Sequence, residues 1–111
     1  MPSLRITKIN ELVRQQLAEI MEKGLSLKPG VFITIAKVDT TKDLRYTRVS
    51  ISVFPADEIN YVMQTLKKEM SRLQNELFGK LHMKPSPRLS FEIDRTEEEA
   101  DKVEKILKDL F

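Results

Sequence analysis

The chain has 111 residues, with 19 Lys and Arg against 17 Asp and Glu and a net charge of +2, so its length allows one compact domain and its totals do not mark a nucleic-acid binder. It contains no Cys, which excludes disulfides, thiolate nucleophiles and Cys-based zinc sites and is typical of the reducing cytoplasm, where we expect the protein to act. No apolar run approaches the roughly 20 residues of a membrane span, and the N-terminus lacks a signal-like apolar core, so we expect neither membrane insertion nor export.

The first predicted element is a helix that begins after Ser3 as its N-cap and stops at Gly24. Its apolar residues recur with the helix period and would form one buried stripe: Ile6, Ile9, Val13, Leu17 and Ile20.

Two predicted strands follow this helix. Residues 31–38 are rich in β-branched side chains, and apolar residues occur at both odd and even positions. This pattern predicts an inner strand with both faces largely buried.

In residues 48–53, apolar and polar side chains alternate, which predicts a strand with one buried and one wet face. The polar segment 39–44 between the two strands is short enough for a hairpin. From Asp57 to about Leu81, the apolar residues fall within about 60° of one line, as in a strongly amphipathic helix. A straight helix of about 25 residues would run to about 37 Å, whereas a domain of this size is roughly 35 Å across, so we expect a bend or break.

Alternation in residues 88–93 predicts a third strand. Thr96 and Glu99 then form a capping box for an acidic C-terminal helix, residues 97–110, with a buried stripe of Ala100, Val103, Leu107 and Leu110. The order predicts an α+β domain over residues 1–111, with helices on one face of a three-stranded sheet. Its α-β-β-α-α-β core is the order of the type II KH-like fold, an RNA-binding architecture, with the C-terminal helix added.

Several short motifs carry a resemblance to a known family. They are Lys8-Ile9, Leu17-Ala18-Glu19-Ile20, Val38, Asp43-Leu44, Val49, Leu77-Phe78-Gly79-Lys80, Lys84, Pro87, Leu89, Phe91, Asp94 and Thr96. In this order and spacing they resemble the ribosome-binding factor A family over nearly the whole chain. The resemblance implies a single KH-like domain that binds the small ribosomal subunit and assists maturation of its RNA. The family's Ala-x-Gly kink falls here on Met70-Ser71-Arg72, which contains no glycine.

The sequence contains few residues that could carry out catalysis. His82 is the only histidine, so no Ser-His or Cys-His pair is available, and no glycine-rich phosphate loop is present. The run Glu97-Glu98-Glu99 is better explained by the positive end of the helix dipole than by a bound cation. We therefore expect no enzyme activity, no cofactor and no metal.

More residues of the sequence are suited to RNA binding. On the long helix, Tyr61, Lys68 and Arg72 fall within about 40° of one another, opposite the apolar stripe, where the cations could neutralise phosphates and a wet Tyr could stack on an unpaired base. A charged face that only keeps the helix soluble is the alternative. Other candidate contacts are Lys67, Lys80, Lys84, Arg45, Arg48, Arg88, Arg5 and Lys8. Lys80 and Lys84 occupy positions that are basic in the family that the chain resembles.

We therefore expect a monomeric, non-enzymatic assembly factor whose partner is the 16S rRNA of free rather than translating small subunits. Two alternatives stay open: a general KH-type RNA-binding module, and a protein-interaction domain that uses its acidic C-terminal helix. Charge is sorted along the chain, because residues 1–88 carry 15 basic and 9 acidic side chains whereas residues 89–111 carry 4 and 8. The KH-like core is thus the expected phosphate-facing part.

Overall fold

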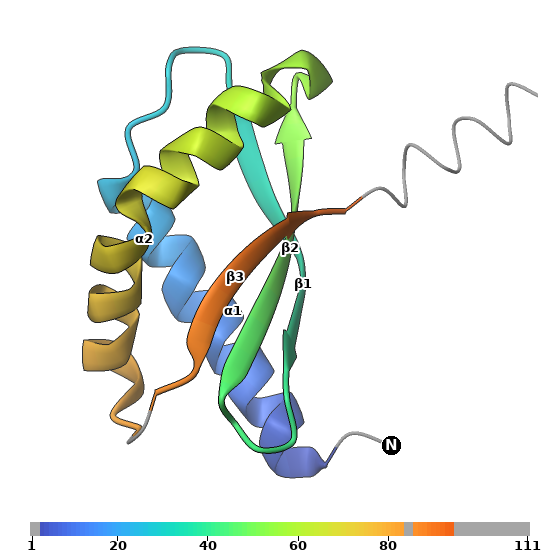
Figure 1. Ribbon diagram of the computed structural model, residues 1–111, viewed down its shortest axis with the longest axis vertical. Coiled ribbons are helices and arrows are strands. Elements are labelled where there is room, and N and C mark those ends of the chain that lie inside the picture. The colour runs from blue at the N-terminus through green and yellow to red at the C-terminus, as the bar shows by residue number, and fades with distance from the viewer. Residues whose placement is uncertain (1–2, 84–85, 95–111) are drawn as a thin grey trace, which may run out of the picture.

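The computed structural model describes residues 3–83 and 86–94. In chain order the elements are α1 (Leu4–Gly24), β1 (Phe32–Thr40), β2 (Tyr46–Phe54), the 3-10 turn η1 (Ala56–Glu58), α2 (Ile59–Leu81) and β3 (Arg88–Ile93). Both helices pack against the same side of the sheet (Figure 1). The predicted α+β class is confirmed over this part of the chain, but one α-helix stands between β2 and β3 where the predicted KH-like order has two. The predicted C-terminal helix, residues 97–110, lies outside the described residues.

The boundaries of α1 follow from its sequence. Ser3 is the N-cap, and its hydroxyl oxygen accepts a hydrogen bond from the Ile6 N–H at 3.2 Å. The helix ends at Gly24, as predicted, and the backbone N–H of Leu25 donates to the Met21 carbonyl at 3.0 Å. Its buried residues form the face that packs on the sheet and on α2: Ile6, Val13, Leu17, Ile20 and Met21.

The sheet has the order β1-β2-β3, with β2 antiparallel to β1 and parallel to β3. The prediction that the first strand is an inner strand is wrong, because β1 is an edge strand. A bulge between Ile35 and Lys37 shifts the register, so Ile35 and Val38 both face the core although they differ in parity. On the opposite face of the sheet, Phe32 is 64% exposed and pairs with Phe54 across the strands.

Helix α2 is continuous over 23 residues, which corresponds to about 34 Å. Figure 1 shows its axis turning partway along, so the predicted break is a bend within one helix. Near its start, the Thr65 hydroxyl donates to the Tyr61 carbonyl at 2.9 Å, a back-bond of the kind that often bends helices. The helix ends where His82 adopts a left-handed conformation, with φ of 52°.

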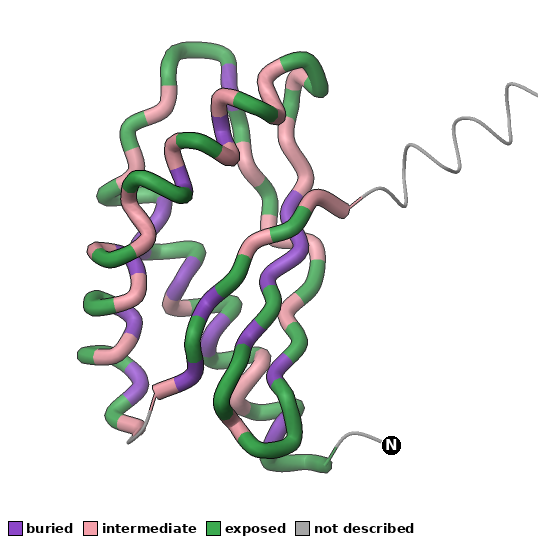
Figure 2. Tube along the Cα trace, viewed as in Figure 1, coloured by how far each residue is buried: buried purple, intermediate pink, exposed green. Residues whose placement is uncertain are grey.

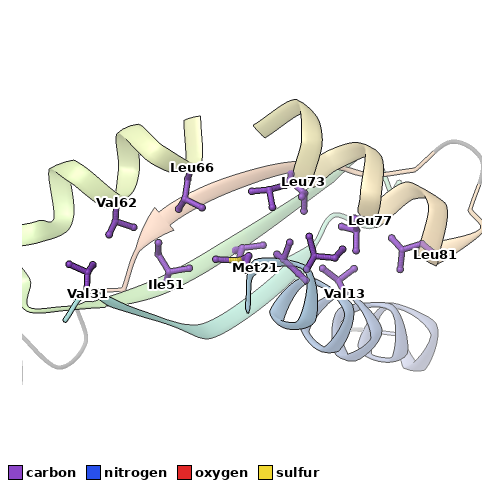
Figure 3. Close-up of a cluster of buried hydrophobic side chains, with 13 residues drawn as sticks. Val13, Met21, Val31, Ile51, Val62, Leu66, Leu73, Leu77 and Leu81 are labelled. Atoms are coloured by element: carbon purple, nitrogen blue, oxygen red, sulfur yellow. The ribbon is translucent and has the colours of Figure 1, made fainter. Parts of the chain in front are cut away.

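The core lies between the two helices and the inner face of the sheet. Figure 3 shows Val62, Leu66 and Leu73 of α2 pointing toward Ile51 of β2 and the residues of α1. Figure 2 shows buried positions recurring along each helix and strand with exposed positions between them, as the amphipathic patterns predict. The polar flanks of α2 and the ends of the strands therefore remain at the surface, where a partner can reach them.

Candidate nucleic-acid interface

Two lysines on the exposed side of α2 are the clearest candidates for phosphate contacts. Lys67 and Lys68 are both exposed, and neither side chain forms an ion pair or hydrogen bond with any residue in 3–83 or 86–94. Lys67 lies on the flank of α2 that faces β3 and lines a groove there, whereas Lys68 follows it on the solvent side. We call these two residues the α2 lysine pair, and their ammonium groups are available to a bound anion.

Arg72 is bonded within the fold. Its Nε donates to Glu69 Oε2 at 2.8 Å and its Nη1 to Glu76 Oε1 at 3.2 Å, while its Nη2 donates to the Gly24 carbonyl at 2.7 Å. The hydrogen bond to Glu69, with a smaller contribution from Glu76, raises the pKa of Arg72. The guanidinium thus joins α2 to the Gly24 carbonyl at the end of α1, so its predicted contact with phosphate would compete with these bonds.

Tyr61 is also not a free aromatic. Its side chain is half-buried against the core, and its hydroxyl accepts a hydrogen bond from the Lys28 N–H at 3.0 Å. The Lys28 ammonium lies 4.6 Å from the ring centroid and pairs with Glu58 at 2.8 Å, and the hydrogen bond to Glu58 raises the pKa of Lys28. The prediction of a wet ring ready to stack on a base is therefore wrong for this conformation.

A second basic region lies at one end of the molecule. Figure 1 shows the start of α1, the turn between β1 and β2, and the start of β3 at the same end of the fold. The Arg88 N–H donates to the Arg45 carbonyl at 2.8 Å, which ties the start of β3 to that turn. The exposed cations of this region, which we call the basic end, are Arg5, Lys8, Lys42, Arg45 and Arg88.

The turn that carries Arg45 is ordered by Asp43. The Asp43 carboxylate accepts the Thr41 hydroxyl at 2.6 Å and the Arg45 N–H at 3.1 Å, and these hydrogen bonds lower the pKa of Asp43. Leu44 takes the left-handed conformation that the turn requires, with φ of 62°. Lys42, also exposed in this turn, was not among the predicted contacts, although its place in a polar hairpin was visible in the sequence.

The remaining candidates are spread over other surfaces. Arg48 is exposed on the outer face of the sheet, 3.7 Å from Glu92, whose carboxylate also accepts the Ser50 hydroxyl at 3.0 Å. Lys80 lines a hollow between α1 and α2 together with Glu76 and residues of the last turns of α1. Lys84 lies outside the described residues. The structure thus brings together only part of the predicted set, at the basic end.

Within the described part of the chain, no group of three or more His, Cys, Asp or Glu residues is placed to hold a metal ion. The two helices there are also too polar to cross a membrane.

The chain matches the family model of ribosome-binding factor A over residues 5–107. A relative named Ribosome-binding factor A from Chlorobium phaeobacteroides is 33% identical, with 97% of this chain and 95% of the relative aligned. One of the same name from Christiangramia forsetii is 30% identical over 94% of this chain and 82% of the relative.

Solved structures agree with this likeness. The crystal structure of ribosome-binding factor A from Thermus thermophilus superposes with a TM-score of 0.70 at 23% identity, over 82% of this chain and 97% of that one, which shows a shared fold. A Thermus thermophilus homology model, fitted into a cryo-EM map of a 30S complex of that factor, superposes with a TM-score of 0.64 at 26% identity, over 75% of this chain and 88% of that one.

Proposed function

The chain belongs to the ribosome-binding factor A family, and from that membership we propose that it binds the small ribosomal subunit and assists maturation of the 16S rRNA without catalysing a reaction. The observation that carries the proposal is the family match, which extends over residues 5–107. A relative of the same fold has been fitted into a map of a 30S complex, which supports the same class of partner here.

The α2 lysine pair and the basic end supply the phosphate contacts in this proposal. Their cations are exposed, and those of the α2 lysine pair have no carboxylate partner among the described residues. Arg72 and Tyr61 act instead as scaffold, because their polar groups are bonded to α1 and to the loop before β1. Since the contacts are mostly to phosphate, recognition depends on the shape of the RNA surface more than on base sequence.

The protein acts by differential binding. It stabilises one arrangement of the subunit RNA only to the extent that it binds this arrangement more tightly than the competing ones. A rigid surface suits this role because the cations keep fixed positions relative to one another, and the hydrogen bonds of Arg72 and Asp43 supply that rigidity. Immature subunits are therefore the expected preferred partner, and free subunits in the cytoplasm are preferred over translating ones.

The protein acts as a monomer in this proposal. The free edge of β1 is interrupted by the bulge at Ala36, and Arg14 donates a hydrogen bond to the Ala36 carbonyl from α1. Both features hinder the pairing of β1 with the same strand of a second copy.

Charge reversal of the α2 lysine pair tests the proposal. We expect Lys67→Glu combined with Lys68→Glu to weaken co-sedimentation with immature small subunits at least tenfold at moderate salt. The magnitude of the slope of log binding constant against log salt concentration should decrease by about 1.5, because two phosphate contacts are lost. The matched control is Lys23→Glu with Lys37→Glu, which changes the net charge equally at exposed positions outside the proposed surface.

Equal binding by both folded variants would show that the α2 lysine pair is not the contact surface. Binding of wild-type protein that is indifferent to salt and nuclease would contradict RNA recognition itself, and would favour a protein-interaction domain. A preference for free single-stranded RNA over purified subunits would instead indicate a general RNA-binding module.

A further inference from the structure

An open groove runs between α2 and β3 on the side of the molecule away from α1. Its volume is about 650 Å³. The floor and walls are apolar and the rim is polar, with Met63, Met70, Leu89 and Phe91 inside and Gln64 and Lys67 at the edge. Three of the five apolar residues that line the groove, Met63, Met70 and Phe91, are only half-buried, so no described residue fully covers this flank of α2.

The strand β3 forms one wall of this groove, and one of its edges pairs with no other strand among the described residues. The Arg88 N–H donates to the Arg45 carbonyl just before β2 and the Asp94 N–H to Ile51 of β2, so by alternation the N–H groups of Leu89, Phe91 and Ile93 point away from β2. At Leu89 the backbone groups of this edge are already bonded. The Gln74 side-chain amide accepts a hydrogen bond from the Leu89 N–H at 2.8 Å and donates one to the Pro87 carbonyl at 2.8 Å. Beyond Leu89, no residue in 3–83 or 86–94 bonds to this edge, and native proteins commonly cover such edges with a helix.

We propose that the C-terminal segment, residues 97–110, docks as an amphipathic helix in the groove between α2 and β3. The sequence predicts a helix there with one apolar stripe, from Ala100 through Val103 and Leu107 to Leu110. An isolated helix of this length is marginal in water, so its stripe needs a surface to pack on. The stripe spans eleven residues, with a rise of about 15 Å from first to last, and the groove extends along α2 from Asn60 to Met70, also eleven residues.

Tethering and charge both favour this occupant over an external one. The segment begins directly after β3, and Phe91, which lines the groove, is six residues before Glu97. So short a connection gives a high effective concentration at the groove. Residues 95–111 carry six acidic and four basic side chains, and Glu99 and Glu104 flank the stripe on the predicted helix. Lys67, which is exposed and unpaired in the described structure, lies at the rim to receive them.

Docking has a consequence that rests on the proposed function. Carboxylates held beside Lys67 compete with phosphate for the α2 lysine pair, so the docked segment weakens RNA binding and RNA binding favours its release. The C-terminal segment is then an intramolecular competitor for the surface that binds the subunit.

Methionine methyl NMR of the full chain tests the docking directly. Met63 and Met70 line the groove, whereas Met21 is buried in the core and serves as the internal reference. The test variant is Val103→Ser with Leu107→Ser, which removes the stripe without changing charge. The control is Asp101→Asn with Lys105→Gln, which alters the opposite side of the predicted helix and also leaves the net charge unchanged.

We expect the test variant to move the Met63 and Met70 methyl signals and raise their solvent accessibility, while Met21 and the control variant stay at wild-type positions. Unchanged Met63 and Met70 signals would overturn the docking. So would wild-type signals that show an empty groove until RNA or a foreign peptide is added, because the occupant would then be external.

A second measurement separates this proposal from the proposed function. If the segment competes with phosphate, the test variant should bind small subunits three- to tenfold more tightly than wild type, and the control should not. A methyl shift with no subunit binding by any variant would leave the docking in place and contradict the proposed function. A methyl shift with equal affinities for all variants would overturn the competition.

Discussion

Gly24 and Arg72 depend on each other. A Cβ added at Gly24 would lie 2.5 Å from Nη1 of Arg72, closer than carbon and nitrogen atoms approach without bonding. The lack of a side chain at the end of α1 is therefore what lets the guanidinium reach the Gly24 carbonyl, where it satisfies one of the acceptors that a helix end leaves open. A cation at this end also opposes the negative pole of the helix dipole.

This arrangement predicts a non-additive pair of substitutions. In an Arg72→Ala background, Gly24→Ala should raise the Tm by about 2 to 4 °C, because Ala loses less conformational entropy than Gly in a helix. In wild type, the same change should give no gain or a loss, because the new methyl group displaces the guanidinium from Gly24, and with it the contact to Glu76. Thermal unfolding of the wild type, the two single variants and the double variant measures the coupling between Gly24 and Arg72. Equal Tm shifts for Gly24→Ala in the two backgrounds would contradict this coupling.

At this scale, the candidate site could be predicted only in part. The helical wheel identified Lys68 as an outward-facing cation, because it depends only on the period of α2, whereas Lys67 was named as a candidate without being placed on a face. It did not predict the bonds of Arg72 and Tyr61, because their partners Gly24 and Lys28 are distant in sequence and reach them only in the folded chain. Side chains on the flanks of a helix have neighbours that periodicity does not specify.

Among the elements, the attachment of β3 to α2 depends on one amide. Gln74 accepts from the Leu89 N–H and donates to the Pro87 carbonyl, both at 2.8 Å, and so bonds to the backbone as a neighbouring strand would. No other described side chain forms a hydrogen bond to these two backbone groups. The half-buried amide therefore fixes where β3 begins relative to the helix, and with it the floor of the groove beside Lys67.

Removing this amide should loosen β3. We expect Gln74→Ala to cost about 1 to 3 kcal/mol in the free energy of unfolding, because it leaves a partly buried backbone N–H without a partner. Urea denaturation measures the loss, and hydrogen exchange of the Leu89 amide should speed up more than that of Val49 in β2. The neighbouring Asn75→Ala, at an exposed position of the same helix, is the matched control and should stay close to wild type.

The elements themselves were largely predictable, because their apolar periods of 3.6 and 2 follow from backbone geometry. The misplacement of β1 as an inner strand has a specific cause. Ile35 and Val38 have opposite parity and yet face the same side, since the bulge at Ala36 inserts one residue between them. An apolar pattern at both parities is thus produced by a bulge as well as by burial on two faces, and the sequence alone does not separate the two.

Over the whole molecule, the cations of the proposed RNA-binding surface fall into two regions. The α2 lysine pair lies partway along α2, whereas the basic end gathers cations from the start of α1, the β1–β2 turn and the start of β3 (Figure 1). The bonds of Asp43 and the pairing of Arg88 with Tyr46 hold the basic end in one shape. A subunit surface that meets both regions must present phosphates at two places.

The two regions should therefore contribute independently to subunit binding. We expect Lys8→Glu with Arg88→Glu to weaken co-sedimentation, with a fall in the salt slope of about 1.5 for two lost phosphate contacts. Combined with Lys67→Glu and Lys68→Glu, the losses in binding free energy should add if the two regions bind different phosphates, because their side chains share no partner among the described residues. A combined variant no weaker than one double variant would show that only one region touches the RNA.

The parallel pairing of β2 with β3 bears on how the chain folds as it is made. β1 and β2 are joined by a short turn and can pair as soon as both have been synthesised, but Thr47 of β2 meets Leu89 only after 42 further residues, including all of α2. Until then the inner strand has one bare edge and the apolar face of α2 lacks part of its sheet. Completion of the sheet thus waits for the last described strand, and the basic end, which includes the start of β3, is complete only at that late stage.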